Sequence, residues 1–149
     1  MEQEVVFIVL SLDNKSRVIC DLTEKYYNSG KHVILYVENE RQADDLDKML
    51  WTWKQSSFIP HINLPNLTAP TEEPVVITQS FHENMGYDIL IQVTPVQDEI
   101  RKQFPLVIDF AEKYDVNALQ RSRDRYRKLQ QEHVKLKSMQ AGEFMHASI

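Results

Sequence analysis

Three observations predict a three-layer α/β fold with a mostly parallel sheet. Residues 5–10 and 32–37 are apolar runs of strand length without polar alternation, which is typical of strands buried on both faces. Between them, residues 15–28 carry apolar side chains at helical spacing, so a strand, a helix and a strand follow one another within the first 37 residues. Strands and helices continue to alternate along the chain, a pattern typical of a parallel sheet with helices on both faces.

The predicted helices are bounded by residues that commonly begin and end helices. One face of residues 15–28 carries the apolar side chains Val18, Ile19, Leu22 and Tyr26. Gly30 follows where a left-handed residue commonly ends a helix. A second helix is predicted to begin at Asn39, because Asn39 and Gln42 have the spacing of a capping box, in which each side chain accepts a hydrogen bond from the other residue's backbone N–H.

The second half of the chain continues the pattern. Residues 54–74 contain four prolines and are predicted to form a long surface loop. A strand, a turn, a strand, a helix and a strand are then expected at residues 75–78, 84–86, 87–93, 96–104 and 106–110. Recurring apolar residues predict one long closing helix over residues 116–138. We therefore expect a single domain over residues 1–138, with a Rossmann-like sheet topology, and a weakly ordered tail over residues 139–149.

Length and composition fit one soluble globular domain. The chain has 149 residues, of which 42% are apolar and 26% are charged. Its apolar runs are far shorter than the roughly 20 residues that span a bilayer, and the acidic start MEQEVV lacks the order of a signal peptide. Cys20 is the single cysteine, and its place on the apolar side of a helix favours a buried thiol over a nucleophile. We expect a cytoplasmic protein without a membrane segment.

The residues argue against catalysis and against a bound cofactor. A loop that cradles phosphate needs glycine, yet none of the three glycines follows a strand to open a helix. The five histidines lack the spacing of metal ligands, and no serine lies in a G-x-S-x-G turn. His61 closes a loop with a proline, where bonding to the backbone is favoured over general-base chemistry. We expect no catalytic residue, metal or cofactor; a small nucleotide-binding or nucleotide-processing enzyme on the same sheet is the alternative.

Large apolar residues gather at the end of the second predicted helix and in the loop after it. They are Trp51, Trp53, Phe58 and Ile59. This is more apolar surface than a connection between elements needs. Two explanations stay open: the loop folds back onto the core, or it contacts a partner.

Charge is distributed unevenly along the chain. The formal net charge is −5, but residues 112–137 carry eight Lys or Arg against four Asp or Glu, whereas residues 1–111 carry nine against seventeen. An acidic body disfavours strong binding to duplex phosphate. The basic residues of the closing helix fall on two stripes, with Arg121, Arg125 and Lys128 on one and Arg123 and Arg127, beside Tyr126, on the other. This pattern fits either a docked helix with a solvated basic face or a site for an acidic peptide.

A longer motif spans residues 38–61. It reads E-N-E-x-Q-A-x-x-L-D-x-x-L-W and then S-F-I-P-H, and its matching residues are Gln42, Ala43, Leu46, Asp47, Leu50, Trp51, Ser57, Phe58, Pro60 and His61. This combination resembles the chi subunit of bacterial DNA polymerase III. The Y-D-I-L-I of residues 87–91 and the R-x-R-Y of residues 123–126 agree with the same family. The resemblance therefore covers most of the chain and is dense in its middle.

The resemblance implies a non-catalytic accessory subunit of the polymerase III holoenzyme that acts in DNA replication. Proteins of this family link the clamp-loader assembly, through a small partner called psi, to the acidic C-terminal tail of single-stranded-DNA-binding protein. A tail that ends in aspartates, an apolar residue and a free carboxylate fits guanidinium groups beside an apolar slot.

Two sets of site residues follow from the resemblance. The tail would bind the closing helix through Arg121, Arg123, Arg125, Tyr126 and Arg127. Psi, or a helicase on the same surface, would contact Trp51, Trp53, Phe58, Pro60 and His61. One departure from the family is a lysine that would fall near Leu119 or Gln120, and Arg121 is a candidate to replace it.

Overall fold

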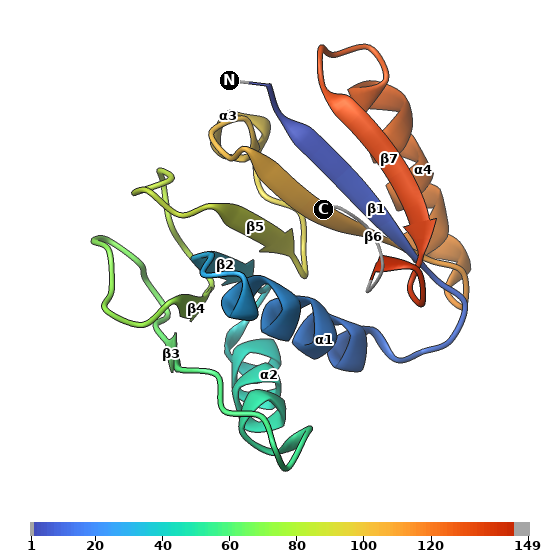
Figure 1. Cartoon of the computed structure of the whole chain (residues 1–149). Helices are drawn as coiled ribbons and strands as arrows, with labels where there is room; N and C mark the ends of the chain where they lie inside the picture. Colours follow the sequence, from blue (N-terminus) through green and yellow to red (C-terminus); the bar gives the residue numbers. More distant parts are fainter. Residues whose placement is uncertain (1, 145–149) are drawn as a thin grey trace.

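A seven-stranded, entirely parallel sheet forms the centre of the computed structural model, which describes residues 2–144. The strand order across the sheet is β3-β4-β2-β5-β6-β1-β7. Helices α1 and α2 cover one face, and α3 and α4 lie on the other (Figure 1). The predicted three-layer α/β fold with a parallel sheet is confirmed.

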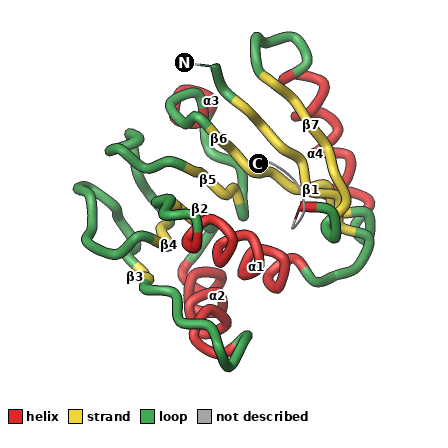
Figure 2. Tube along the Cα trace, in the orientation of Figure 1, coloured by secondary structure: helices red, strands yellow, loops and turns green. Residues whose placement is uncertain are grey.

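Most elements lie where the sequence predicts them, with small differences at their ends. The first half of the chain contains β1 (Glu4–Leu10), α1 (Lys15–Asn28), β2 (Val33–Tyr36), α2 (Glu40–Thr52) and β3 (His61–Asn63). The second half contains β4 (Val75–Thr78), β5 (Ile89–Gln92), α3 (Asp98–Arg101), β6 (Leu106–Glu112), α4 (Val116–Leu129) and β7 (Lys135–Gln140). Their alternation along the chain is visible in Figure 2.

Turns and a capping residue mark where the helices and strands begin and end. Gly30 ends α1 with φ of 76°, and Met85 and Gly86 make a tight turn before β5 with φ of 54° and 86°. At the start of α2, the Gln42 N–H donates to Asn39 Oδ1 over 2.9 Å. The return bond is displaced by one residue, because Gln42 Oε1 accepts from the N–H of Glu38 rather than from that of Asn39. Asn39 still caps the helix.

Each face of the sheet has its own apolar core. Side chains of α1 and α2 pack with β1, β2 and β6 on one face, and Phe144 joins this core near the end of the described chain. The other core includes Phe7, Phe104 and Leu129. Burial on both faces explains why the inner strands are continuous apolar runs rather than alternating ones.

The predicted long closing helix over residues 116–138 is wrong in its second half. α4 ends at Leu129, and β7 pairs in parallel with β1 at the edge of the sheet. Leu129, His133 and Leu136 fit helical spacing, but Leu136 and Lys137 also begin an alternating strand pattern. Pairing with β1, more than 120 residues earlier in the sequence, decides between the two patterns.

Two other expectations need correction or fall partly outside the structure. The predicted loop over residues 54–74 contains β3, and its side chains Ile59 and Leu67 are buried. Within the predicted tail, residues 139 and 140 belong to β7 and Phe144 is buried. Residues 145–149 lie outside the described part of the chain.

Proline substitutions in β7 test the strand assignment. The N–H of Lys135 donates to the carbonyl of Gln3, just before β1, and that of Ala141 to the carbonyl of Val9 in β1, so by alternation the N–H of Lys137 faces β1 and that of Ser138 faces outward. Lys137→Pro should lower the free energy of unfolding by about 2 kcal/mol, because a buried β1 carbonyl loses its donor. Ser138→Pro should cost much less, since outward N–H groups on edge strands tolerate proline. Urea unfolding measures both; equal losses would contradict the strand.

Candidate functional sites

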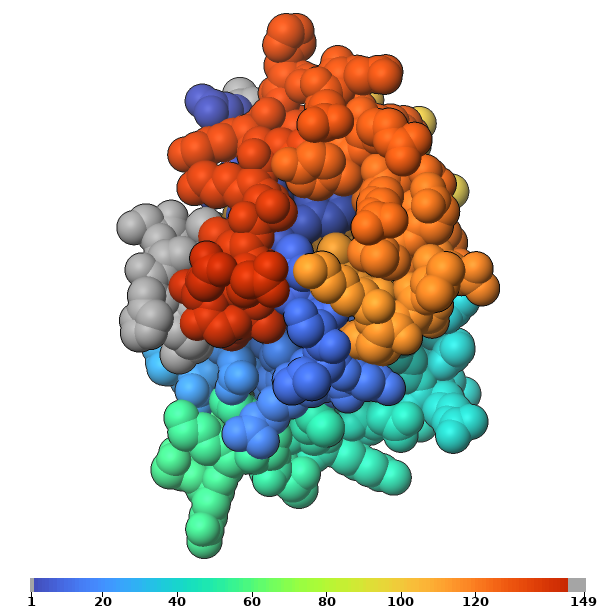
Figure 3. All heavy atoms as spheres, turned by 90° about the vertical axis from the view of Figure 1, so that its right-hand side faces the viewer, coloured from blue at the N-terminus to red at the C-terminus, as the bar shows by residue number. Residues whose placement is uncertain are grey.

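A groove between α4 and β7 brings together apolar and basic side chains. Figure 3 shows a hollow between α4 in orange and β7 in red, with blue atoms of β1 at its floor. The cavity has a volume of about 210 Å³. Its lining residues define what we call the α4 groove: Phe7, Val9, Ala111, Lys113, Leu119, Ser122, Arg123, Tyr126 and Ser138. The floor is largely apolar and cations stand at the rim.

The two cations of the α4 groove have no partner within residues 2–144. Neither Arg123 nor the Lys113 ammonium forms a hydrogen bond or an ion pair there. Of the other basic residues of α4, Arg125 pairs with Asp109, Arg127 weakly with Asp124, and Lys128 with Asp98, while Arg121 lines a different cavity. The positive charge that is free to bind an anion at the groove is therefore that of Lys113 and Arg123.

Tyr126 forms one wall of the α4 groove. Its ring packs edge-on against Phe7 of β1, with the ring centroids 5.3 Å apart. The ring therefore has a fixed position, and its hydroxyl forms no hydrogen bond within the described chain. Tyr126 can thus offer both an apolar surface and a polar atom to a bound group.

Arg125 lies on the opposite side of α4 from the groove and serves the fold. Its Nε donates to Asp109 Oδ2 over 2.8 Å, and its terminal nitrogen donates to Asp109 Oδ1 over 2.9 Å. Asp109 is only 2% exposed, and it also accepts from the Phe110 N–H. This two-point pair fastens α4 to β6. The structure therefore does not bring Arg125 together with Arg123 and Tyr126.

A second cavity lies at the carboxyl ends of β2, β5 and β6, where nucleotides commonly bind in open parallel sheets. It has a volume of about 370 Å³. Two ion pairs stand in it, Arg125 with Asp109 and Lys15 with Glu112, and the Lys15 ammonium also donates to the Val93 carbonyl. No glycine opens the loops around it. Arg121 lines this cavity rather than the α4 groove.

The buried thiol and the possible metal ligands can be described from the part of the chain that the structure covers. Burial raises the pKa of the Cys20 thiol to about 12, so the thiolate is scarce at neutral pH, and the expected buried cysteine is confirmed. No group of three or more His, Cys, Asp or Glu side chains that could hold a metal ion exists in the part of the chain that the structure describes. In residues 2–144, no helix is both long and apolar enough to cross a bilayer.

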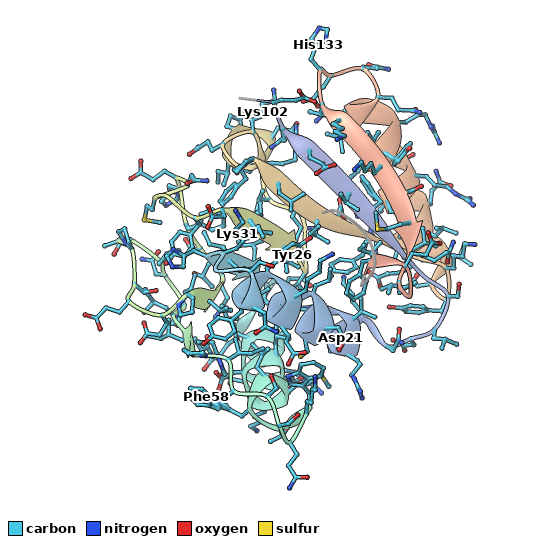
Figure 4. All side chains as sticks on the ribbon, in the orientation of Figure 1. Asp21, Tyr26, Lys31, Phe58, Lys102 and His133 are labelled. Atoms are coloured by element: carbon cyan, nitrogen blue, oxygen red, sulfur yellow. The ribbon has the colours of Figure 1, made fainter. Side chains whose placement is uncertain are left out.

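An aromatic patch forms at the other edge of the sheet. It consists of Trp51, Phe58 and His61. Trp51 is 51% exposed and Phe58 is 66% exposed, and Figure 4 shows Phe58 on the loop that follows α2. The ring centroids of Trp51 and His61 are 4.4 Å apart. The loop partly folds back onto the core, because Ile59 is buried there. Trp51 and Phe58 face outward and are exposed enough to contact a partner.

His61 is the buried member of the aromatic patch and supports the exposed ring of Trp51. Its Nδ1 lies 2.6 Å from the Ile59 carbonyl, to which it donates when protonated. Its Nε2 lies 3.1 Å from Asp47 Oδ1, close enough for an ion pair with a protonated ring, although the two atoms are not aligned as in a hydrogen bond. The residue is 8% exposed. His61 is thus a buried support beneath Trp51.

The remaining residues predicted for this surface lie apart from the patch or beneath it. Trp53 packs against the core that α1 forms with the sheet, and the Arg17 guanidinium lies 5.6 Å from its ring centroid. Pro60 is half-buried between the buried residues Ile59 and His61. Trp51 and Phe58 therefore carry the exposed surface.

Lys113 is the groove residue that sequence reasoning missed. It lies in the connection between β6 and α4, outside every helical stripe of α4. Its N–H donates to the Leu10 carbonyl over 2.9 Å, which holds the connection against the end of β1. The sequence signal that could have found it is the parallel pairing of β1 with β6, because this pairing places residue 113 beside the predicted helix.

The comparisons with known proteins agree with this architecture. Residues 1–137 match the family model described as DNA polymerase III chi subunit, HolC. The chain belongs to this family of polymerase III subunits, as its resemblance predicts. Over 113 residues it is 31% identical to the DNA polymerase III subunit chi of Haemophilus influenzae, covering 75% of this chain and 77% of that one. With the Escherichia coli subunit chi it shares 31% identity over 115 residues, covering 74% and 75%.

A solved structure shows that the fold extends beyond the family. The crystal structure of T4 UvsW superposes with a TM-score of 0.60 at 8% sequence identity. The match covers 94% of this chain but 42% of that one. At such low identity the likeness concerns the fold alone.

Replacing the two arginines of the R-x-R-Y motif should separate their roles. Arg125→Ala should lower the free energy of unfolding by about 3 kcal/mol, because Asp109 would remain buried without its cation. This is the low end of the range of roughly 3–5 kcal/mol for breaking a buried ion pair, since Arg125 is partly exposed. Arg123→Ala should change it by less than about 0.5 kcal/mol, as is usual for exposed side chains. Chemical denaturation of both variants gives the answer, and equal midpoints would refute the structural role of Arg125.

Proposed function

We propose that this chi-family protein is a non-catalytic subunit of DNA polymerase III that binds the acidic C-terminal tail of single-stranded-DNA-binding protein in the α4 groove. The observation that carries the proposal is an apolar groove with two cations at its rim, Lys113 and Arg123, that have no partner within residues 2–144. An apolar terminal side chain fits the slot beside Tyr126. Its carboxylate and the preceding acidic residues fit the two cations.

The proposal places the carboxyl end of the peptide toward the turn that joins α4 to β7. Figure 4 shows His133 at the tip of that turn. Val134 and Leu136 pack there against the core cluster that contains Leu129. A terminal apolar side chain beside Tyr126 would extend this apolar surface.

The absence of intrinsic catalysis is part of the same proposal. Where the fold would place a nucleotide, ion pairs of Arg125 and Lys15 stand instead, and both are fixed by hydrogen bonds. A phosphate there would meet the carboxylates of Asp109 and Glu112. These features disfavour the alternative of a nucleotide-processing enzyme.

The aromatic patch is the proposed contact for a psi-like subunit or for a helicase that uses the same surface. Exposed tryptophan and phenylalanine side chains are typical anchors of protein interfaces. Trp51 is held by His61 and Phe58 rather than free to move, which lowers the entropy cost of binding.

Peptide titration tests the tail site. Arg123→Ala and Lys113→Ala should each weaken binding about tenfold or more, because each removes a charge-assisted contact that is worth roughly 1.5–3 kcal/mol. Tyr126→Ala should have a similar effect through loss of the slot. Fluorescence anisotropy with a labelled acidic peptide that ends in phenylalanine measures these affinities, which should fall with added salt.

Arg127→Ala is the matched control for this titration, since Arg127 is equally basic but lies outside the groove and pairs with Asp124. It should bind the peptide within about twofold of the wild type, because an exposed pair contributes little. Amidation of the peptide's terminal carboxylate should weaken binding as much as loss of one cation does. The tail site would be refuted by salt-independent binding, or by loss of affinity in Arg127→Ala alone.

Truncation of the aromatic patch tests the second surface. Trp51→Ala and Phe58→Ala should each weaken binding of a psi-like subunit by about 2 kcal/mol or more, the usual loss for an interface anchor. Both variants should stay folded, because these side chains are exposed, and both should bind the tail peptide normally. Isothermal titration of each partner distinguishes the sites. Normal psi binding by both variants would contradict the assignment and leave a helicase as the candidate.

A further inference from the structure

Exposed apolar side chains lie at the end of the α4 groove nearest the start of α4. Among residues 2–144, five large apolar side chains are markedly exposed, and three of them lie at this end. They are Leu12, Tyr114 and Val116, which we call the end patch, with exposures of 70%, 37% and 83%. The other two, Trp51 and Phe58, belong to the aromatic patch.

The end patch is continuous with the groove. Val116, Leu119, Arg123 and Tyr126 follow one another at spacings of three and four residues along the same side of α4. The connections after β1 and β6 meet here, since the Lys113 N–H donates to the Leu10 carbonyl. Figure 3 shows the loop after β1, in blue, below the hollow between α4 and β7.

Val116 has no evident role in building α4. It is the first residue of the helix, directly after the capping residue Asp115, whose carboxylate accepts from the N–H groups of Asn117 and Ala118. Valine is a poorer helix former than most residues at such a position, and this one buries almost none of its surface in the described chain.

We propose that the end patch binds a second apolar residue of the peptide that occupies the α4 groove, about five positions before its terminus. This inference rests on the proposed tail site and specifies its ligand. Ten helical residues from Val116 to Tyr126 span about 15 Å, which an extended peptide covers in four to five residues. The partner is thus an extended segment with an apolar terminus, acidic residues opposite Lys113 and Arg123, and an apolar residue upstream.

Charge around the end patch restricts what can lie there. Burial raises the pKa of the Tyr114 hydroxyl, and the nearby carboxylates of Glu112, Asp13 and Asp115 raise it further, so these three negative charges stand at this end. An acidic side chain over Val116 would be repelled. The acidic residues of the ligand therefore belong near the middle of the groove, and the upstream position belongs to an uncharged apolar residue.

Three synthetic peptides with a free carboxylate and an N-terminal fluorophore test this inference on the full chain. They are Asp-Asp-Ala-Phe, Leu-Ala-Asp-Asp-Ala-Phe and Ser-Ala-Asp-Asp-Ala-Phe. The leucine peptide should bind wild type about fivefold more tightly than the serine peptide, since partial burial of leucine contributes a fraction of its full transfer energy. In Val116→Ser, the ratio between the affinities of the leucine and serine peptides should fall to less than about twofold. Leu12→Ser should also lower this ratio.

The short peptide and a control variant separate the possible outcomes. Asp-Asp-Ala-Phe should bind wild type and Val116→Ser equally, because it does not reach the end patch. Phe58→Ser removes an exposed apolar side chain from the aromatic patch and should keep the full preference for leucine. If the short peptide binds but leucine adds nothing, or Val116→Ser keeps the preference, the end patch is refuted and the tail site stands. If no peptide binds wild type, both proposals fail.

Discussion

The ion pair between Arg125 and Asp109 fastens α4 to β6, between the two cavities that flank this helix. Asp109 is buried in β6, so its carboxylate needs full compensation, which Arg125, the Phe110 N–H and the Gln92 amide provide. The guanidinium that compensates it lines the cavity at the carboxyl ends of the strands, where nucleotides commonly bind in open parallel sheets. On its other side, the same helix leaves β7 partly uncovered and so forms the groove. The same ion pair thus lines one cavity and holds the helix that walls the other.

Helical geometry explains why the two arginines of the R-x-R-Y motif have different roles. Residues two positions apart on an α-helix point about 200° away from each other, given 3.6 residues per turn. Arg123 and Arg125 therefore cannot face the same ligand, although they are neighbours in the motif. The sequence places both on basic stripes but does not reveal that a buried aspartate of β6 lies under one of them. Which arginine lies over Asp109 depends on how α4 packs against the sheet.

The elements that sequence analysis predicted well are those determined by local pattern. Strands buried on both faces and helices with caps, such as α2 with Asn39, can be read from a few neighbouring residues. The errors concern long-range pairing. β3 and β7 are the two edge strands, each with a single neighbour, and their sequences carry weaker apolar patterns than the inner strands. Lys113 was missed for the same reason, since it reaches the groove from a connection that only sheet pairing brings beside α4.

The two candidate surfaces lie at opposite edges of the sheet, the aromatic patch beside β3 and the α4 groove beside β7. Six spacings between seven strands separate these edges by about 29 Å, at roughly 4.8 Å per spacing. Ligands on the two surfaces would not touch, and exposed charges at that distance are screened well beyond a Debye length. A close-packed parallel sheet is a stiff spacer, because its strands cannot slide without breaking both cores. If both proposed surfaces bind partners, the sheet would hold those partners at a fixed separation, and each would bind independently of the other.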